Sequence, residues 1–370
     1  MDTKNIERRC DSMHVVYNED EKIIRIKNDA GEEIIYHSSL DLDPEYDDTQ
    51  YNFRIFFKND IAESDSCMVY DKATKIRMGW MIPCQALFSR EHEYADDQYF
   101  QKYAYVAIVN LLKFNFSKLC GCDNVEEKLI KLYTMDDLYK NDRSILIISK
   151  ENTAQIKGFT LDEYIPYLFS YGYTCCDGAL DISARELESK RIYLKKISDE
   201  ISDNFFVKEL FESMWRNNLS SIVKFHLLYQ IIEILIMKVF DNELKIIINE
   251  IKEGDKNLFV LKNRISNITN ENYRIEKLFN EYSKIQNEDK TELVGMCKKF
   301  LAASNNEIEQ DDSNSKGLGK YIYKVRNLLF HSYHTIPANE RGQINLINEK
   351  MLKIIIDVVV SYKNIVAIHQ

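Results

Sequence analysis

Arg326 and His331 are the residues of this chain whose types and spacing best suit chemistry on a phosphate ester. A guanidinium offers a planar fork of hydrogen-bond donors that matches phosphate oxygens, and an imidazole exchanges protons near neutral pH. Both lie in a segment, residues 313–339, that contains no Asp or Glu, although the chain has 59 acidic residues and a formal net charge of −10. This local excess of positive charge predicts a site for an anion.

Five polar side chains of the same segment follow one another at helical spacing. Steps of four, three, four and three residues place them along one stripe of a helix: Lys320, Lys324, Asn327, His331 and His334. His331 lies in the last turns of this predicted helix, where the macrodipole favours a cation.

Four apolar residues give the predicted helix a second face that can pack into a bundle. They are Tyr321, Val325, Leu328 and Leu329. Gly317 and Gly319 mark the start of the helix, and Pro337 limits how far it can run.

The run from Arg326 to His331, RNLLFH, matches the R-polar-x-x-x-H signature of HEPN domains. Its setting is similar too, because the motif ends one helix of an all-α region and another long apolar helix follows. The resemblance covers roughly residues 205–370. It implies a metal-independent endoribonuclease without a cofactor, which dimerises so that two motifs meet. In such enzymes the 2′-hydroxyl of the RNA attacks, leaving a 2′,3′-cyclic phosphate and a 5′-hydroxyl.

The resemblance also implies a role for each motif residue. Arg326 would stabilise charge on the scissile phosphate, and His331 would act in the proton transfers. Asn327 would orient the phosphate or the guanidinium.

Four further residues are expected to contact RNA in this scheme. Lys320 and Lys324 would bind phosphates if the dimer groove passes them, and His334 would lie beside the groove. Tyr333 would stack a base, with packing inside the bundle as the alternative.

Two residues of an earlier apolar helix bear on the site. Glu233 is an acid among apolar residues, and it is expected either to pair with Arg326 or His331 or to reach water at the edge of the helix. His226, seven residues earlier, is expected to be a core histidine.

Spacing alone is a weak signal, because Arg9 and His14 repeat it in a polar N-terminal stretch with no helical pattern. Geometry adds a constraint: residues i and i+5 lie about 140° apart on a helix. Arg326 and His331 can therefore meet at one phosphate only if the helix end distorts, the Arg reaches around, or a second subunit contributes.

The elements that must position these residues change in type near residue 204. Residues 1–203 are predicted to form a mixed α+β domain, a candidate sensor or regulatory part. Its predicted strands cover residues 21–27, 32–38, 52–57, 66–70, 76–82, 143–149 and 189–198, and its predicted helices cover 99–114 and 158–172.

Residues 204–370 are predicted to form an all-α, HEPN-like bundle, because apolar residues recur there at helical spacing. The predicted helices cover residues 205–215, 221–240, 273–285, 291–304, 320–330 and 348–366.

Composition narrows the class of protein. An acidic chain does not suit broad nucleic-acid binding, which needs a wide basic surface. The polar N-terminus resembles no signal peptide, no apolar run is long enough to span a bilayer, and irregular cysteine spacing favours reduced thiols. We therefore expect a cytoplasmic protein that binds no membrane and no metal.

We interpret the sequence as that of a ribonuclease acting on tRNA or mRNA as a homodimer, in a bacterial toxin, abortive-infection or anti-phage (antiviral) defence role. A trigger or a neutralising protein is an expected further partner. The alternative is a non-catalytic dimerisation, adaptor or nucleotide-binding module of the same helical type.

Overall fold

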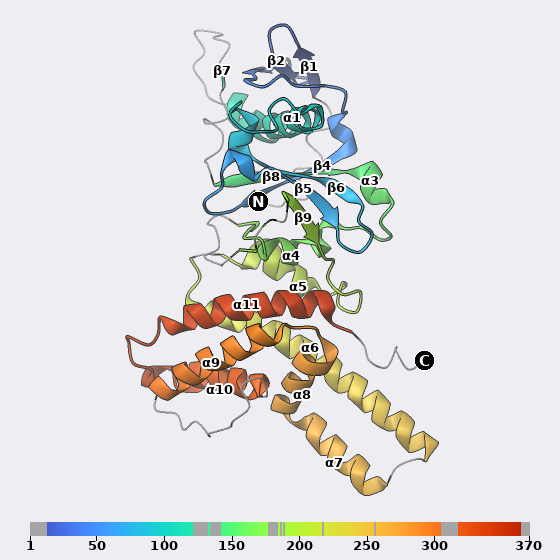
Figure 1. The fold of residues 1–370 in the computed structure, drawn as a ribbon, viewed down its shortest axis with the longest axis vertical. Coiled ribbons are helices and arrows are strands. Elements are labelled where there is room, and N and C mark those ends of the chain that lie inside the picture. The colour runs from blue at the N-terminus through green and yellow to red at the C-terminus, as the bar shows by residue number, and fades with distance from the viewer. Residues whose placement is uncertain are drawn as a thin grey trace. The chain divides into compact units, whose positions relative to one another are not determined.

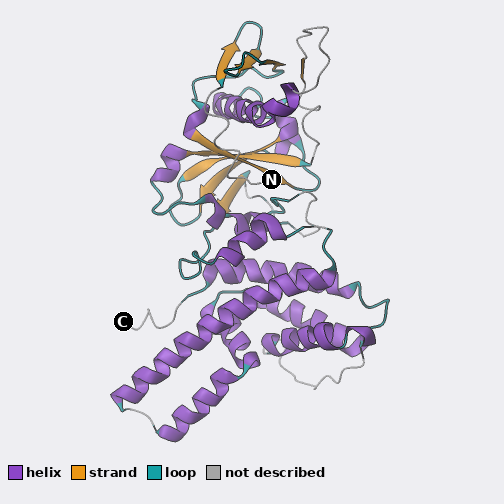
Figure 2. Cartoon of the chain, turned by 180° about the vertical axis from the view of Figure 1, so that it is seen from behind, coloured by secondary structure: helices purple, strands orange, loops and turns teal. Residues whose placement is uncertain are grey.

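The computed structural model describes residues 13–120, 132–133, 142–176, 184–185, 187, 189–216, 218–254, 257–304 and 317–363. A sheet-rich N-terminal region precedes a helical C-terminal region (Figures 1 and 2), as the sequence predicts. The chain divides into two compact units. The first comprises Met1–Thr160, Tyr171–Leu180 and Arg185–Lys195, and the second comprises Leu161–Ser170, Asp181–Ala184 and Lys196–Gln370.

The first unit contains two sheets. In the smaller one, β1 (His14–Asn18), β2 (Ile23–Lys27) and β3 (Glu33–His37) form an antiparallel meander, and β7 (Leu132–Tyr133) pairs with β3 in parallel. Gly31, at a φ of 82°, lies in the turn between β2 and β3.

The larger sheet has five strands in the order β4-β8-β6-β5-β9. Neighbours are antiparallel except β5 and β9, which run in parallel. The strands are β4 (Tyr51–Phe57), β5 (Cys67–Asp71), β6 (Arg77–Pro83), β8 (Arg143–Ser149) and β9 (Arg191–Leu194), each inside or overlapping a predicted strand.

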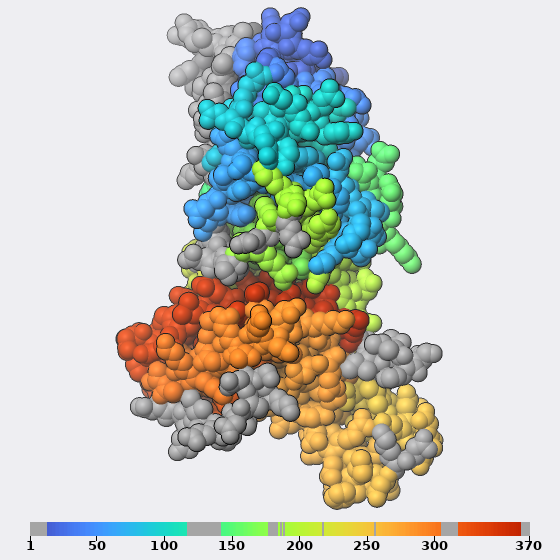
Figure 3. All heavy atoms as spheres, viewed as in Figure 1, coloured from blue at the N-terminus to red at the C-terminus, as the bar shows by residue number. Residues whose placement is uncertain are grey.

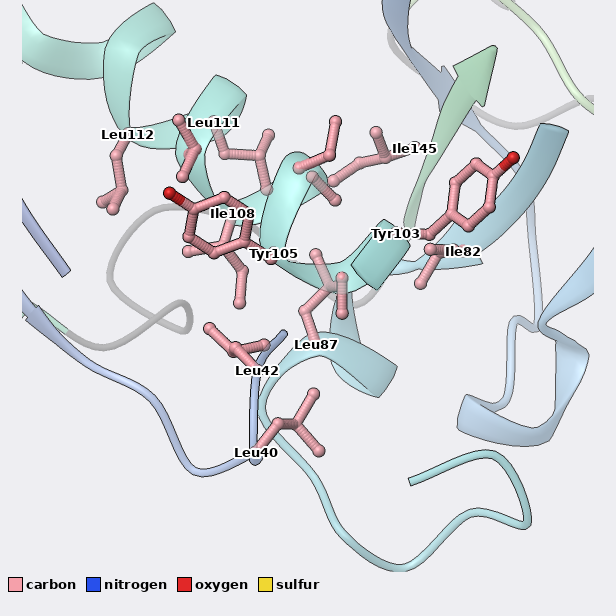
Figure 4. Packing of buried hydrophobic residues seen from close by; sticks show 14 of the residues in the cluster. Leu40, Leu42, Ile82, Leu87, Tyr103, Tyr105, Ile108, Leu111, Leu112 and Ile145 are labelled. Atoms are coloured by element: carbon pink, nitrogen blue, oxygen red, sulfur yellow. The ribbon is translucent and has the colours of Figure 1, made fainter. Parts of the chain in front are cut away.

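Helix α1 (Gln98–Cys120) lies between the two sheets, as Figure 1 shows. Its residues from Tyr103 to Val109 are all buried, because one side packs on β2 and β3 and the other on β4 and β8. A helix that is apolar all round needs such a double cover. Figure 4 shows part of this core, with Tyr103, Tyr105, Ile108 and Leu111 of α1 among the apolar side chains.

Short elements connect the strands: η3 (Asp48–Gln50), η4 (Glu63–Asp65), η5 (Cys84–Leu87) and α3 (Lys150–Ala154). The single helix predicted over residues 158–172 is wrong in extent. The structure has a 3-10 turn, η6 (Leu161–Glu163), and then the one-turn helix α4 (Ile165–Phe169). Pro166 has no N–H to donate to a preceding turn, so it sits at the start of a new helix.

The second unit is helical, and each of the six predicted helices overlaps helical residues there. The two predicted over residues 205–215 and 273–285 are each a short α-helix followed by a π-helix. Besides η6 and α4, its elements are α5 (Phe205–Glu209), the π-helix η7 (Leu210–Met214), α6 (Ser221–Glu253), α7 (Leu258–Thr269), α8 (Glu271–Lys277), the π-helix η8 (Leu278–Tyr282), α9 (Asn287–Ala303), α10 (Leu318–His331), η9 (Tyr333–Thr335) and α11 (Gln343–Ser361). Residues 364–366, predicted to extend α11, lie outside the described residues.

Helix packing around α10 fixes the position of the candidate site. α10 packs on α8 and α9, while α11 packs on α6 and α9. Buried Asp289, in the first turn of α9, lies 2.9 Å from the amino groups of both Lys350 and Lys353 of α11. The motif helix is thus held in a bundle with its own apolar core. Among the described residues, no helix is long and apolar enough to cross a membrane.

Candidate active site

Helix α10 begins where two glycines allow a tight turn and a close helix contact. Gly317 has a φ of 108°, a conformation that L side chains rarely adopt. A Cβ on Gly319 would lie 2.9 Å from the backbone nitrogen of Glu276 and 3.0 Å from the Cβ of Ile275, so the backbones of α10 and α8 nearly touch.

Glu276 of α8 caps the start of α10. Its carboxylate accepts hydrogen bonds from the backbone N–H groups of Gly319, at 2.8 Å, and Lys320, at 3.5 Å. An acid at a helix N-terminus satisfies free donors and complements the macrodipole. Residues 313–339 contain no acid of their own, and Glu276 of α8 therefore provides a carboxylate to them.

The predicted apolar face of α10 is confirmed, since Tyr321, Val325, Leu328 and Leu329 are all buried. The polar stripe is more exposed toward its end. Lys320, Lys324 and Asn327 are half-buried, whereas His331 and His334 are exposed.

Arg326 lies beside two aromatic rings, on the side of α10 that faces α6. The carbon at the centre of its guanidinium is 5.7 Å from the ring centre of Tyr229 and 5.5 Å from that of Phe330. One guanidinium nitrogen donates to Oδ1 of Asn327 at 3.1 Å. The aromatic contacts hold the guanidinium without using its N–H donors, so donors remain for an anion.

Glu233 of α6 meets both sequence expectations. It is about half exposed, with 44% of its side chain accessible, and its Oε1 lies 3.8 Å from Nη2 of Arg326. That distance makes a loose ion pair and not a bidentate clamp. Arg326 is therefore near an acid without being saturated by it.

Tyr229 of α6 is the more buried of the two aromatic residues beside the guanidinium. It is buried, and its hydroxyl donates to Oε1 of Glu271 at 2.6 Å. Burial, together with this hydrogen bond, raises the pKa of Tyr229 well above its ordinary value. The ring therefore stays neutral, which suits contact with a cation.

His331 is the last residue of α10 and is exposed to solvent. The helix ends there, with the Ser332 N–H bonded to the carbonyl of Leu328. In the part of the chain that the structure describes, no hydrogen bond or ion pair joins His331 to Arg326. Their separation around the helix is thus not overcome within one chain.

Sequence reasoning did not single out Phe330, which lies inside the motif and is 40% exposed. Its ring centre is 5.2 Å from that of His226, whose Nε2 is 3.0 Å from the side-chain nitrogen of Gln230. His226 was expected in the core, and this expectation is wrong. It is half-buried because it lies along the edge of α6 that borders Phe330. Its position between Arg326 and His331 is the feature of the sequence from which Phe330 could have been predicted as a site residue.

Tyr333 and His334 follow the helix in the short turn η9. The guanidinium of Arg341 lies over the Tyr333 ring at 4.7 Å, and the ring is half-buried. His334 is exposed. The ring of Tyr333 thus already has one flat partner.

Within the described residues, no group of three or more His, Cys, Asp or Glu side chains is arranged to hold a metal ion. The polar groups on or beside the end of α10 are the guanidinium of Arg326, the amide of Asn327, the imidazoles of His226 and His331, and the loosely paired carboxylate of Glu233. They can bind a phosphodiester and exchange a proton at His331.

No protein-family model matches the chain, and neither the curated proteins nor the solved structures contain a match.

Proposed function

We propose that the helical second unit is a metal-independent endoribonuclease whose chemistry rests on Arg326 and His331. The 2′-hydroxyl of one nucleotide loses its proton to an imidazole of His331 and its oxygen bonds to the adjacent phosphorus. The bond from phosphorus to the 5′-oxygen breaks, and that oxygen takes up a proton. The products are a 2′,3′-cyclic phosphate and a 5′-hydroxyl, so no water or metal enters the balance of this step.

The observation that carries the proposal is the environment of Arg326. Two aromatic rings hold its guanidinium in place, and its nearest carboxylate is 3.8 Å away. A preorganised cation with free donors stabilises charge as it develops on a phosphate, which is commonly the largest catalytic contribution. Asn327, bonded to Arg326, holds the guanidinium in register.

A homodimer through the helical unit completes the site. Arg326 faces α6 while His331 is exposed at the helix end. A second copy would therefore add its own His331 to the Arg326 and His331 of the first. One imidazole then acts as the base and the other as the acid. Lys320, Lys324, Tyr333 and His334 lie along the path of the RNA.

The cellular role in this proposal is cytoplasmic RNA cleavage in a toxin or anti-phage defence system, with tRNA or mRNA as substrate. The first unit senses a trigger or holds the nuclease inactive, and a second protein neutralises the activity. This part rests on the resemblance of RNLLFH to the HEPN motif.

One observation favours the alternative, a non-catalytic adaptor or nucleotide-binding module. In a single chain, Arg326 already has Tyr229, Phe330, Asn327 and Glu233 around it. The adaptor would retain anion binding and lack cleavage, so the two functions separate in one assay.

The deciding experiment is cleavage of total RNA and purified tRNA in excess EDTA by the wild type and by His331→Ala. We expect the wild type to leave cyclic phosphate ends, and the variant to cut at least 100-fold more slowly, because its base is gone.

The chain provides a matched control in His14, which stands at the same spacing after Arg9 and is exposed on β1. His14→Ala should cut like the wild type. Equal cutting by all three proteins would contradict the assignment of His331, and RNA binding without cutting by any would favour the adaptor.

A further inference from the structure

The edge of the larger sheet that β5 and β9 form has one buried face and one open face. Successive residues of a strand point to opposite faces. Val69, Ile192 and Leu194 are fully buried on one of them. Figure 3 shows the lime-green segment that contains β9 at the surface, beside the cyan atoms of α1 and the blue atoms of the N-terminal strands. The residues that alternate with the buried ones are half-buried or exposed: Met68, Tyr70, Arg191 and Tyr193.

The open face belongs to the side of the sheet on which α1 packs. Trp80 of β6 lies opposite Met68 of β5, and its ring packs on α1. A register shift between the two strands places Arg77 opposite Tyr70, and bulges of this kind re-aim a side chain. Arg77 contacts Tyr99 of α1, so it lies on the same side.

Two tyrosines and two bases form one end of the open face. The rings of Tyr70 and Tyr193 stack with their centres 5.3 Å apart and their planes at 28°. Nζ of Lys75 lies 4.9 Å from the ring centre of Tyr193. The guanidinium carbon of Arg191 lies 5.9 Å from the ring centre of Tyr70. A contact with a ring does not use up the N–H donors of a cation, so donors remain for an anion.

Arg77 and Tyr99 extend the face toward α1. The guanidinium carbon of Arg77 lies 5.7 Å from the ring centre of Tyr99, which is 56% exposed, and Arg77 also donates a hydrogen bond to the hydroxyl of Tyr103. A distance of 5.7 Å is close to the outer limit of a cation–π contact, about 6 Å, so the ring remains accessible. We call six residues the basic-aromatic face: Tyr70, Lys75, Arg77, Tyr99, Arg191 and Tyr193.

The three bases of this face are not neutralised by acids. Among the residues that the structure describes, Lys75, Arg77 and Arg191 form no ion pair. In a chain with formal net charge −10, three such bases on one face are a local excess of positive charge, and they complement a polyanion. Neighbouring acids have other partners: Glu93 has Lys190, Glu45 has Lys102, Asp71 has Thr74 and Asp97 has the backbone N–H of Phe100.

Lys75 has a backbone conformation that favours glycine. Its φ is 64°, in the turn between β5 and β6. An L side chain costs free energy there, whereas glycine would form the same turn without strain. The strained residue supplies the amino group beside Tyr193, and strain of this kind persists where a side chain contributes to function.

A sheet face that carries both accessible rings and unneutralised bases suits single-stranded nucleic acid. Unpaired bases stack on aromatic side chains, and phosphates bind Lys and Arg beside them. A duplex keeps its bases stacked on one another, so it could use the cations of such a face but not its rings. An acidic peptide would likewise leave the rings without a stacking partner.

We propose that the basic-aromatic face binds single-stranded nucleic acid, with phosphates at its three bases and nucleobases stacked on its tyrosine rings. The face lies in the first unit, so it is a site separate from Arg326 and His331. It does not rest on ribonuclease activity of the second unit.

The test is binding of a fluorescein-labelled oligouridylate of about 20 nucleotides, which is longer than the stretch that one such domain commonly occupies. Fluorescence anisotropy is measured at several salt concentrations in EDTA. Every full-length protein in the series carries His331→Ala, so that the probe is not cut. Lys75→Gly with Arg191→Ala should weaken binding at least about tenfold and should lower the slope of log K against log salt by about 1.4, at about 0.7 for each lost phosphate contact.

Two single variants separate binding from folding. Lys75→Gly should leave the melting temperature unchanged or raise it, because the backbone strain is relieved. Tyr99→Leu should weaken binding about fivefold or more with the salt slope unchanged, because stacking is lost and no charge is removed. Tyr99→Phe keeps the ring and should bind as tightly as the parent protein.

Matched controls show where the probe binds. Arg25→Ala with Lys27→Ala removes the same charge from β2 of the smaller sheet, and should change neither affinity nor slope. An RNA duplex of equal length should bind more weakly than the single strand.

Three outcomes would overturn the inference. They are unchanged binding by the Lys75 and Arg191 double variant, equal binding of duplex and single strand, and binding that Arg326→Ala abolishes while the face variants retain it. Cleavage is not part of this readout, so the ribonuclease proposal and this site can fail separately.

Discussion

Arg326 shows how a cation is held ready without being neutralised. The rings of Tyr229 and Phe330 lie 5.7 and 5.5 Å from the centre of the guanidinium, while the carboxylate of Glu233 stays at 3.8 Å. A lysine has no planar fork and cannot stack in this way. The residue type therefore matters as much as the charge.

Arg326→Lys should lower RNA cleavage by about 100-fold or more while leaving the fold unchanged, because the charge persists but the oriented donors are lost. Single-turnover cleavage with circular dichroism as a folding check measures this. If Arg326→Lys cleaved RNA at the wild-type rate, the positive charge alone, and not the oriented donors of the guanidinium, would account for catalysis.

Glu233→Gln tests whether the loose ion pair is structural. Exposed pairs contribute about 0–1 kcal/mol, so the free energy of unfolding should change by less than about 1 kcal/mol. Urea unfolding of the variant and the wild type gives the comparison. A loss of several kcal/mol would mean that Glu233 is more tightly coupled to Arg326 than 3.8 Å indicates.

At the scale of elements, the contact between α10 and α8 depends on the missing side chain of Gly319. Gly319→Ala should destabilise the protein by roughly 1–3 kcal/mol, since the new methyl group would meet backbone atoms at 2.9 and 3.1 Å. Gly295, in the middle of α9, has open space around the same position. Gly295→Ala should therefore stabilise by roughly 0.5–1 kcal/mol. Thermal unfolding of the pair checks both signs, and equal signs would contradict the close contact.

The link between α9 and α11 predicts a pH dependence. Burial acts to raise the pKa of Asp289, but hydrogen bonds from Lys353 and Lys350 outweigh it and hold that pKa below its ordinary value of 3.8. A depressed carboxyl pKa contributes stability above the unfolded value that is lost as the pH falls through the folded one. Unfolding measured from pH 6 down to pH 2 should show this loss.

Asp289→Asn should remove that part of the loss, so the protein should take up fewer protons on unfolding below pH 4 than the wild type does. Glu288→Gln is the matched control, because Glu288 is exposed in the same first turn. Identical pH curves for Asp289→Asn and the wild type would contradict the pairing.

Secondary structure could be predicted from the sequence wherever the apolar residues recur at the period of a helix or a strand and are also the buried ones. The strands of the larger sheet and the helices α10 and α11 could be predicted from the spacing of their apolar residues. α7 was missed because its apolar residues from Leu258 to Leu261 are consecutive, which hides the helical period. Glu276 and Phe330 were missed for another reason: a cap from a distant helix and an exposed ring inside a motif are products of packing.

At the scale of the whole molecule, two units with separate cores should unfold in separate steps. Leu146→Ala removes a buried side chain of β8, and Leu293→Ala one of α9. Each should cost about 2–5 kcal/mol, and each should shift a different transition in a calorimetric scan. One transition shifted equally by both would mean a single cooperative unit.

The path of the chain between the units has a consequence during synthesis. Strand β9 pairs with β5 through Met68 and Arg191, yet Leu161–Ser170, which belong to the second unit, leave the ribosome before it does. Until residue 194 emerges, the nascent first unit has β5 as an open edge, with unpaired backbone groups that can bind another chain. We therefore expect polypeptides released early, between residues 160 and 190, to aggregate, and chaperones to be needed longest at that stage of translation.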